Sequence, residues 1–182
     1  SLHKRATVVL DDFRALRPAA ETSTLWIGNP PYVRHHQIAP DWKDWLTREA
    51  RLRGLGASQL AGLHVHFYLA TVLQGQKGDR GTYITSAEWL DVNYGSLVRD
   101  LLLDGLGGLA LHVLDPTAMP FADAATTGAI TCFQLGAKPR SMKVRCIPKV
   151  ADLGKLSGGQ PVARDRLADA PRWSLLLRGG KA

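Results

Sequence analysis

Residues 24–36, TLWIGNPPYVRHH, join an apolar run to a double proline and then to positive charge. The segment 24–28 is typical of a buried β-strand, which the loop at 29–32 ends abruptly. Two consecutive prolines remove two backbone donors and fix two φ angles. The loop is therefore rigid, and it holds the Asn29 amide and the Tyr32 ring in fixed places. A simple turn is the competing interpretation, because Asn-Pro often opens turns.

Short apolar runs and stretches of helical periodicity alternate along the rest of the chain. The pattern predicts strands at 6–10, 24–28, 82–90, 109–115 and 127–136, and helices at 40–56, 59–74 and 95–105. Such alternation is typical of an α/β sheet with crossover connections. Ligands of these sheets bind beyond the carboxyl ends of the strands. The loops after the first three strands are therefore predicted to open on one edge, and the double-proline loop is one of them.

Composition sets broad limits on the function. The chain has 182 residues, 45% of them hydrophobic, which allows one sizeable domain. A net charge of +7 suits a polyanion such as nucleic acid without identifying one. The two cysteines, Cys132 and Cys146, do not make a disulfide framework and are expected to be reduced. No apolar run approaches the length of a membrane span, so we expect a soluble cytoplasmic protein and no membrane partner.

The rigid loop suits one kind of chemical group. The Asn29 side chain and the neighbouring backbone carbonyls present oxygen acceptors to a small donor, and Tyr32 offers a flat face to a planar ring. A donor group on a planar ring describes an exocyclic amine, such as N6 of adenine.

Several further stretches resemble a known family, the N6-adenine DNA methyltransferases of the γ arrangement. The similar members are the TaqI-like and Eco57I-like restriction-modification enzymes, in which Asn-Pro-Pro-Tyr is the catalytic motif. The resemblance covers roughly residues 6–136 in the family's order. It includes VVLDDF at 8–13, the run at 62–103 that contains TSAEWL, and HVLDPTAMPFADAATTGAITCFQLG at 112–136.

The resemblance implies roles for the catalytic loop. Asn29 and the Pro30 carbonyl would each accept a hydrogen bond from the target amine, and Pro31 would complete the rigid bend. Tyr32 would stack on the extruded base, and Phe121 would pack against that base from another side. Ordinary core packing is the alternative for Phe121.

The resemblance also implies a cofactor, S-adenosylmethionine. Asp12 would hydrogen-bond its adenine amine, Phe13 would line that end of the site, and Asn29 would lie where cofactor and base meet. Capping of the following turn is the alternative for Asp12.

By this resemblance the fold is a Rossmann-like, class I S-adenosylmethionine-dependent methyltransferase sheet, with strand order 3-2-1-4-5-7-6. The chain would enter at strand 3, so its N-terminal half would be incomplete and the segment 6–10 poorly anchored. We expect residues 1–137 to be the C-terminal part of the catalytic domain. Residues 138–182 would be a basic linker that begins a target-recognition region. The chain alone is then expected to be inactive, with double-stranded DNA and the missing segments of the same protein as partners.

Other interpretations remain open. The same loop serves methylation of a protein glutamine or of an RNA amine, and a non-catalytic DNA-binding remnant would keep the fold. The pair His64 and His66 suggests a metal, but two residues apart on a helix they point to different sides. We therefore expect no metal site. Arg48, Arg51 and Arg53 either meet DNA phosphates or form a solvated face.

Overall fold

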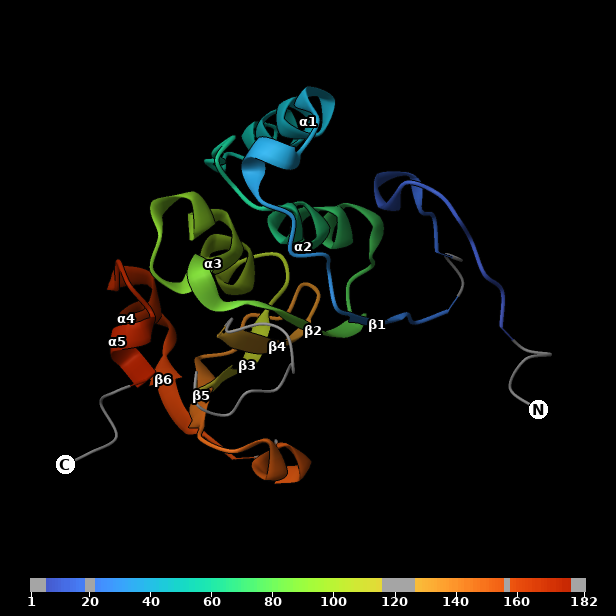
Figure 1. Ribbon diagram of the computed structural model, residues 1–182. Helices are drawn as coiled ribbons and strands as arrows, with labels where there is room; N and C mark the ends of the chain where they lie inside the picture. Colours follow the sequence, from blue (N-terminus) through green and yellow to red (C-terminus); the bar gives the residue numbers. More distant parts are fainter. Residues whose placement is uncertain (1–5, 19–21, 116–126, 156–157, 178–182) are drawn as a thin grey trace.

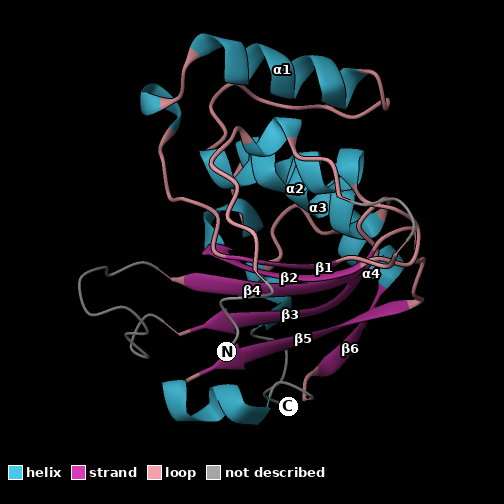
Figure 2. Ribbon diagram, turned by 90° about the vertical axis from the view of Figure 1, so that its right-hand side faces the viewer, coloured by secondary structure: helices cyan, strands magenta, loops and turns pink. Residues whose placement is uncertain are grey.

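A six-stranded mixed sheet with its longest helices stacked on one face makes up the computed structural model (Figure 1, Figure 2). The structure describes residues 6–18, 22–115, 127–155 and 158–177. Its strands are β1 (Leu25–Gly28), β2 (Arg80–Ser86), β3 (Gly108–Leu114), β4 (Gly128–Gln134), β5 (Ser141–Ile147) and β6 (Gln160–Ala163). Its α-helices are α1 (Pro40–Arg51), α2 (Leu63–Gln74), α3 (Ser96–Leu103), α4 (Arg164–Asp169) and α5 (Ser174–Leu177). Among the described residues, no helix combines the length and the apolar character that crossing a membrane requires.

The strands lie in the order β1-β2-β4-β3-β5-β6. β1 is parallel to β2, and β4 is antiparallel to both β2 and β3. β5 is parallel to β3, and β6 is antiparallel to β5. The first four positions reproduce the 4-5-7-6 portion of the order implied by the resemblance, including the antiparallel insertion. The predicted Rossmann-like α/β class is confirmed.

The helices form two layers above the sheet. α2 and α3 lie against it, and α1 lies on the outer side of α2 (Figure 2). α1 begins with a proline at its first position, where no backbone donor is needed, and it turns Leu46 and Ala50 inward. α2 is apolar on most sides because it is covered by the sheet below and by α1 above. Its Tyr68 and Leu69 are fully buried in the core.

The start of β1 is held by one buried carboxylate, that of Asp79. It accepts hydrogen bonds from the backbone N–H of Thr24 at 2.8 Å, the backbone N–H of Gln76 at 2.9 Å and the Trp26 indole at 3.3 Å. Burial alone would raise the pKa of Asp79, but these donors hold the pKa below its usual value. This anchor fixes where β1 begins and so where the loop after it emerges.

The strand predicted at 6–10 is wrong for this structure. The segment has no regular structure, and Val8 and Leu10 are 93% and 102% exposed. A strand forms only when a neighbour takes up its backbone hydrogen bonds. None of the described strands pairs with these residues. Their β-branched composition therefore has nothing to pack against.

The chain after residue 137 differs from the linker predicted there. β5 and β6 extend the same sheet, so residue 137 is not a boundary of the sheet. Beyond them, Trp173 is 1% exposed, packs against Trp89 with ring centroids 6.0 Å apart, and donates its indole N–H to the Leu167 carbonyl. Much of the segment 138–182 thus belongs to the body of the protein.

Candidate active site

The Asn-Pro-Pro-Tyr loop leaves the carboxyl end of β1 at the edge of the sheet. Gly28 precedes it where space is tight, because a Cβ there would lie 3.1 Å from Cε1 of Tyr83. Pro30 is buried, whereas Asn29 is exposed. The loop is therefore packed in place through Pro30 and keeps residue 29 accessible.

Cavities lie on both sides of this loop. The first, of about 470 Å³, is lined by Asn29, both prolines and the rings of Phe13 and Phe67, and is named the Asn29 cavity. The second, of about 650 Å³, is lined by Tyr32 and by residues of α2, β2 and the segment after β2, and is named the Tyr32 cavity. Consecutive residues of one rigid loop thus line two separate cavities.

Asp12 and Phe13 lie near the first of these cavities. Phe13 stacks on Phe67, with ring centroids 4.4 Å apart, and its carbonyl accepts a hydrogen bond from Gln74 of α2. Phe13 and Phe67 also line an adjoining cavity of about 460 Å³ that contains Asp12 and Trp42, named the Asp12 cavity.

The carboxylate of Asp12 already has a partner, Arg14. It accepts from the Arg14 backbone N–H at 2.9 Å and from Nε at 2.9 and 3.1 Å, which caps a short 3-10 turn. Hydrogen bonding to Arg14 lowers the pKa of Asp12, so the group is ionised at neutral pH. The Arg14 guanidinium lies 3.8 Å from the centroid of the Trp42 ring. The capping alternative for Asp12 is therefore present in the structure.

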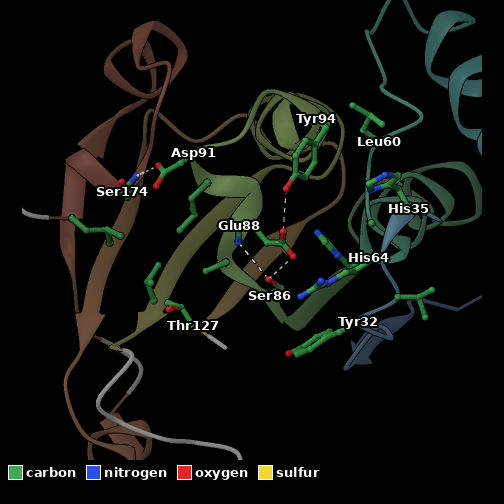
Figure 3. A pocket seen from close by; sticks show the side chains of 17 residues that line it. Tyr32, His35, Leu60, His64, Ser86, Glu88, Asp91, Tyr94, Thr127 and Ser174 are labelled. Carbon is green, nitrogen blue, oxygen red and sulfur yellow. Dashed lines mark hydrogen bonds between the residues drawn. The ribbon is translucent and has the colours of Figure 1, made fainter. Parts of the chain in front are cut away.

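Tyr32 stands at the wall of its cavity and is 38% exposed (Figure 3). Partial burial raises the pKa of its phenol, which is therefore neutral at physiological pH. Across from it, Glu88 accepts hydrogen bonds from the hydroxyls of Ser86 and Tyr94, each at 3.1 Å. Burial and the Glu88 carboxylate raise the pKa of Tyr94. One wall is thus aromatic and the other polar.

His64 is a buried polar residue of the same cavity. It projects from α2 toward the space between Tyr32 and Ser86 (Figure 3). Only 3% of it is exposed, and burial lowers the pKa of its imidazole to about 4 despite the nearby Glu88. His66 faces elsewhere, since it stacks on Trp45 of α1 with ring planes 14° apart.

Two further points concern Phe121 and possible metal ligands. Phe121 lies outside the described residues. In the part of the chain that is described, no three histidine, cysteine, aspartate or glutamate residues gather in a way that could hold a metal ion.

Sequence reasoning named the loop but not the opposite wall. Ser86, Glu88 and Tyr94 lie in the segment that resembles the methyltransferases, yet no role was assigned to them. The available signal was the expectation that the loop after the strand predicted at 82–90 opens on the same edge of the sheet as the double-proline loop.

Comparisons with known proteins agree with this arrangement. The family described as Eco57I restriction-modification methylase matches residues 25–106, which include the loop and most of the Tyr32 cavity. The Type II methyltransferase M.XamI of Xanthomonas campestris pv. amaranthicola is 51% identical over 175 residues. The match covers 96% of this chain and 33% of that protein, so the chain spans about a third of the length of this relative.

Solved structures show the same fold at low sequence identity. The type IIG restriction endonuclease BpuSI matches with a TM-score of 0.57 and 16% identity, over 74% of this chain and 16% of that chain. The type IIL restriction-modification enzyme MmeI, solved with DNA, matches with a TM-score of 0.53 and 19% identity, over 77% and 18%. A putative class I S-adenosylmethionine-dependent methyltransferase of Listeria monocytogenes matches with a TM-score of 0.52 and 10% identity, over 85% and 44%.

Proposed function

We propose, on the premise that this chain is a relative of the Eco57I restriction-modification methylases, that it carries the catalytic loop of a DNA adenine-N6 methyltransferase. The reaction would transfer a methyl group from S-adenosylmethionine to a flipped adenine in duplex DNA. The observation that carries the proposal is the position of residues 29–32 between two cavities. Methyl transfer requires a donor site and an acceptor site that meet at one point.

The loop supplies the acceptors that this chemistry needs. The Asn29 side-chain oxygen and the Pro30 carbonyl would each accept one hydrogen of the target amine. Drawing both hydrogens aside moves the nitrogen toward tetrahedral geometry and frees its lone pair for attack on the methyl group. A strong base is unnecessary, because the amine becomes acidic only once it is methylated. The prolines fix these oxygens before the base arrives, which is the preorganisation that makes such contacts effective.

The Tyr32 ring would compensate for extrusion of the base. Taking a base out of the duplex costs a few kcal/mol. Stacking on an aromatic side chain returns roughly 1–3 kcal/mol. Hydrogen bonds in a site that excludes water supply the remainder. Phe121 is proposed as the second packing partner.

The residues near the Asp12 cavity fit the cofactor. A carboxylate suits an adenine amine, and the Phe13 and Phe67 rings suit its flat faces. The Asp12 carboxylate has about four acceptor positions, and Arg14 offers it the hydrogens of its backbone N, Nε and Nη2, so Asp12 can accept one further hydrogen bond while Arg14 stays in place. S-adenosylmethionine would supply an activated methyl group at the Asn29 cavity, which shares Phe13 and Phe67 with the Asp12 cavity.

The whole protein's partners follow from the same proposal. Leu25 and Ile27 of β1 are 64% and 72% exposed, and β1 ends the described sheet. A cofactor-binding segment that supplies strands beyond β1 would cover these side chains. A target-recognition region and double-stranded DNA would complete the assembly, in the cytoplasm.

A chimera with the relative tests the proposal. In it, this chain replaces the 175 aligned residues of M.XamI. The chimera is incubated with methyl-labelled S-adenosylmethionine and with duplex DNA, RNA or protein. We expect label on adenine N6 of DNA and a loss of about 100-fold or more in Asn29→Ala, since one preorganised contact is removed.

Asn93→Ala is the matched control, because Asn93 is an exposed asparagine outside both cavities. It should leave the rate unchanged. Label on RNA would instead identify an RNA amine methyltransferase, and label on glutamine a protein-glutamine methyltransferase. A chimera that binds DNA and transfers no methyl group would identify a non-catalytic domain.

A further inference from the structure

His64 is a buried polar side chain that faces the Tyr32 cavity without a partner. Only burial and the Glu88 charge act on the His64 imidazole, and neither ring nitrogen forms a hydrogen bond among the described residues, although the side chain is 3% exposed. The Nδ1–Cε1 edge lies against Gly62, where a Cβ would be 3.1 Å from Nδ1. Nε2 lies farther from that backbone. A buried histidine normally satisfies its nitrogens, so an unpaired one at a cavity wall suggests that a ligand completes it.

Other polar side chains across from Tyr32, namely Ser86, Glu88 and Tyr94, already hydrogen-bond to one another. Ser86 and Tyr94 each donate a hydroxyl hydrogen to the Glu88 carboxylate. They therefore face the cavity as acceptors, as does Glu88 itself. Because the His64 imidazole stays neutral at physiological pH, it carries one N–H donor and one acceptor. Among His64, Ser86, Glu88 and Tyr94, His64 is the side chain with a hydrogen left to donate.

An adenine ring needs such a donor. Once Asn29 and Pro30 have taken both amine hydrogens, the other polar atoms of adenine are the ring nitrogens N1, N3 and N7, and all are acceptors. We propose that His64 donates its N–H to one ring nitrogen of the flipped adenine and thereby selects the base held against Tyr32. This inference rests on the proposed function and adds a base-contacting residue that comes from α2 rather than from the loop.

Atom replacement in the substrate provides the test. The methylated position of the unaltered chimera is first mapped on plasmid DNA. Duplexes are then made with adenine, 1-deazaadenine, 3-deazaadenine or 7-deazaadenine at that position, each analogue replacing one ring nitrogen by C–H. In the unaltered chimera, one analogue should lower kcat/KM by about 10- to 100-fold, the effect of losing a hydrogen bond to a buried donor.

The same penalty should disappear when the donor is removed. In His64→Phe, methylation of adenine should slow, and the sensitive analogue should be within about twofold of adenine, because the two changes remove one contact. His64→Gln retains an N–H donor and should keep part of the penalty. His66→Phe changes the same residue type on the same helix, but on the side facing α1, and should keep all of it.

Three results would overturn the inference. In the first, all three analogues have the same kcat/KM as adenine in the unaltered chimera. In the second, the sensitive analogue keeps its full penalty relative to adenine in His64→Phe. In the third, His64→Phe lowers kcat/KM equally for adenine and all three analogues. An unaltered chimera that leaves adenine unmethylated is a different result, because it removes the proposed function itself. Circular dichroism of each variant verifies that the fold is retained.

Discussion

Mild acid should destabilise this protein through histidines that are buried in the neutral form. His64 and His66 are 3% and 0% exposed, and burial lowers the pKa of each from 6.5 to about 4. Both nitrogens of His66 are buried without a hydrogen-bond partner, so a proton there would bring an uncompensated charge into the core. The unfolded chain therefore binds more protons than the folded chain between these two values, and the free energy of unfolding falls as the pH falls through that window.

The size of the effect follows from the two pKa values. At about pH 7 each histidine has lowered the free energy of unfolding by only about 0.2 kcal/mol relative to its fully neutral form. Between about pH 7 and about pH 5.5 each lowers it by about 1.2 kcal/mol more. The pair then costs about 2.5 kcal/mol. His112 is also buried, and burial lowers its pKa, so it acts in the same direction. Asp12 and Asp79 titrate below this window, because their pKa values are lowered from 3.8.

Urea unfolding followed by tryptophan fluorescence at the two pH values measures this loss. His66→Phe keeps an aromatic ring against Trp45, removes an unpaired donor and should remove about 1.2 kcal/mol of the pH effect. At neutral pH the same variant should be more stable by about 1 kcal/mol. His36→Gln changes an exposed histidine and should leave the pH effect intact. Equal stability of the unaltered protein at both pH values would refute the reasoning.

Substitutions at Asp79, Trp173 and Tyr32 test the site and its framework. Asp79→Ala leaves three N–H groups without their acceptor and should cost about 3 kcal/mol in urea unfolding, whereas replacement by Asn should cost less because one oxygen remains. Trp173→Ala empties a buried site beside Trp89 and should lower the free energy of unfolding by about 3–5 kcal/mol. Leu175→Ala, at a 59% exposed position, is the neutral control. Equal effects of the two substitutions would mean that the C-terminal segment is not packed against the rest of the protein. In the chimera, Tyr32→Phe should retain most methylation and Tyr32→Ala should lose about 10- to 100-fold, and an unchanged Tyr32→Ala would argue against base stacking.

Local pattern predicted the central elements well. The apolar runs that became β3 and β4 and the periodic run that became α2 are long enough for burial to decide their structure. The strand predicted at 82–90 ends at Ser86, because the Ser86 side chain accepts a hydrogen bond from the Glu88 N–H and starts a 3-10 turn. That single cap turns the chain and creates the polar wall of the Tyr32 cavity.

The errors have a common physical cause, the dependence of strands on neighbours. The β-branched run at 6–10 has the composition of a strand but no partner among the described residues. Residues 141–147 have partners, although their basic side chains suggested a linker. Met142 and Val144 are buried and Lys143 is exposed, which is the alternation of a strand with one covered face.

The residues of the site that are adjacent in sequence could be predicted, whereas those that only the tertiary fold brings together could not. Asn29 and Tyr32 follow from four consecutive letters. His64 comes from α2 and Glu88 from the turn after β2, and the two reach the same cavity only because the tertiary fold brings these elements together. A helical pattern indicates which side is apolar, but it does not indicate which buried side chain ends at a cavity.

The bare edge of β1 affects how the isolated polypeptide would behave in a test tube. None of the described strands pairs with the outer side of β1, so the backbone amides beside Leu25 and Ile27 are a template for another extended chain, including a second molecule of the same kind. Concentrated samples of the chain are therefore expected to self-associate through the edge of β1. A lysine in place of Ile27 should keep them monodisperse in light scattering without disturbing the core.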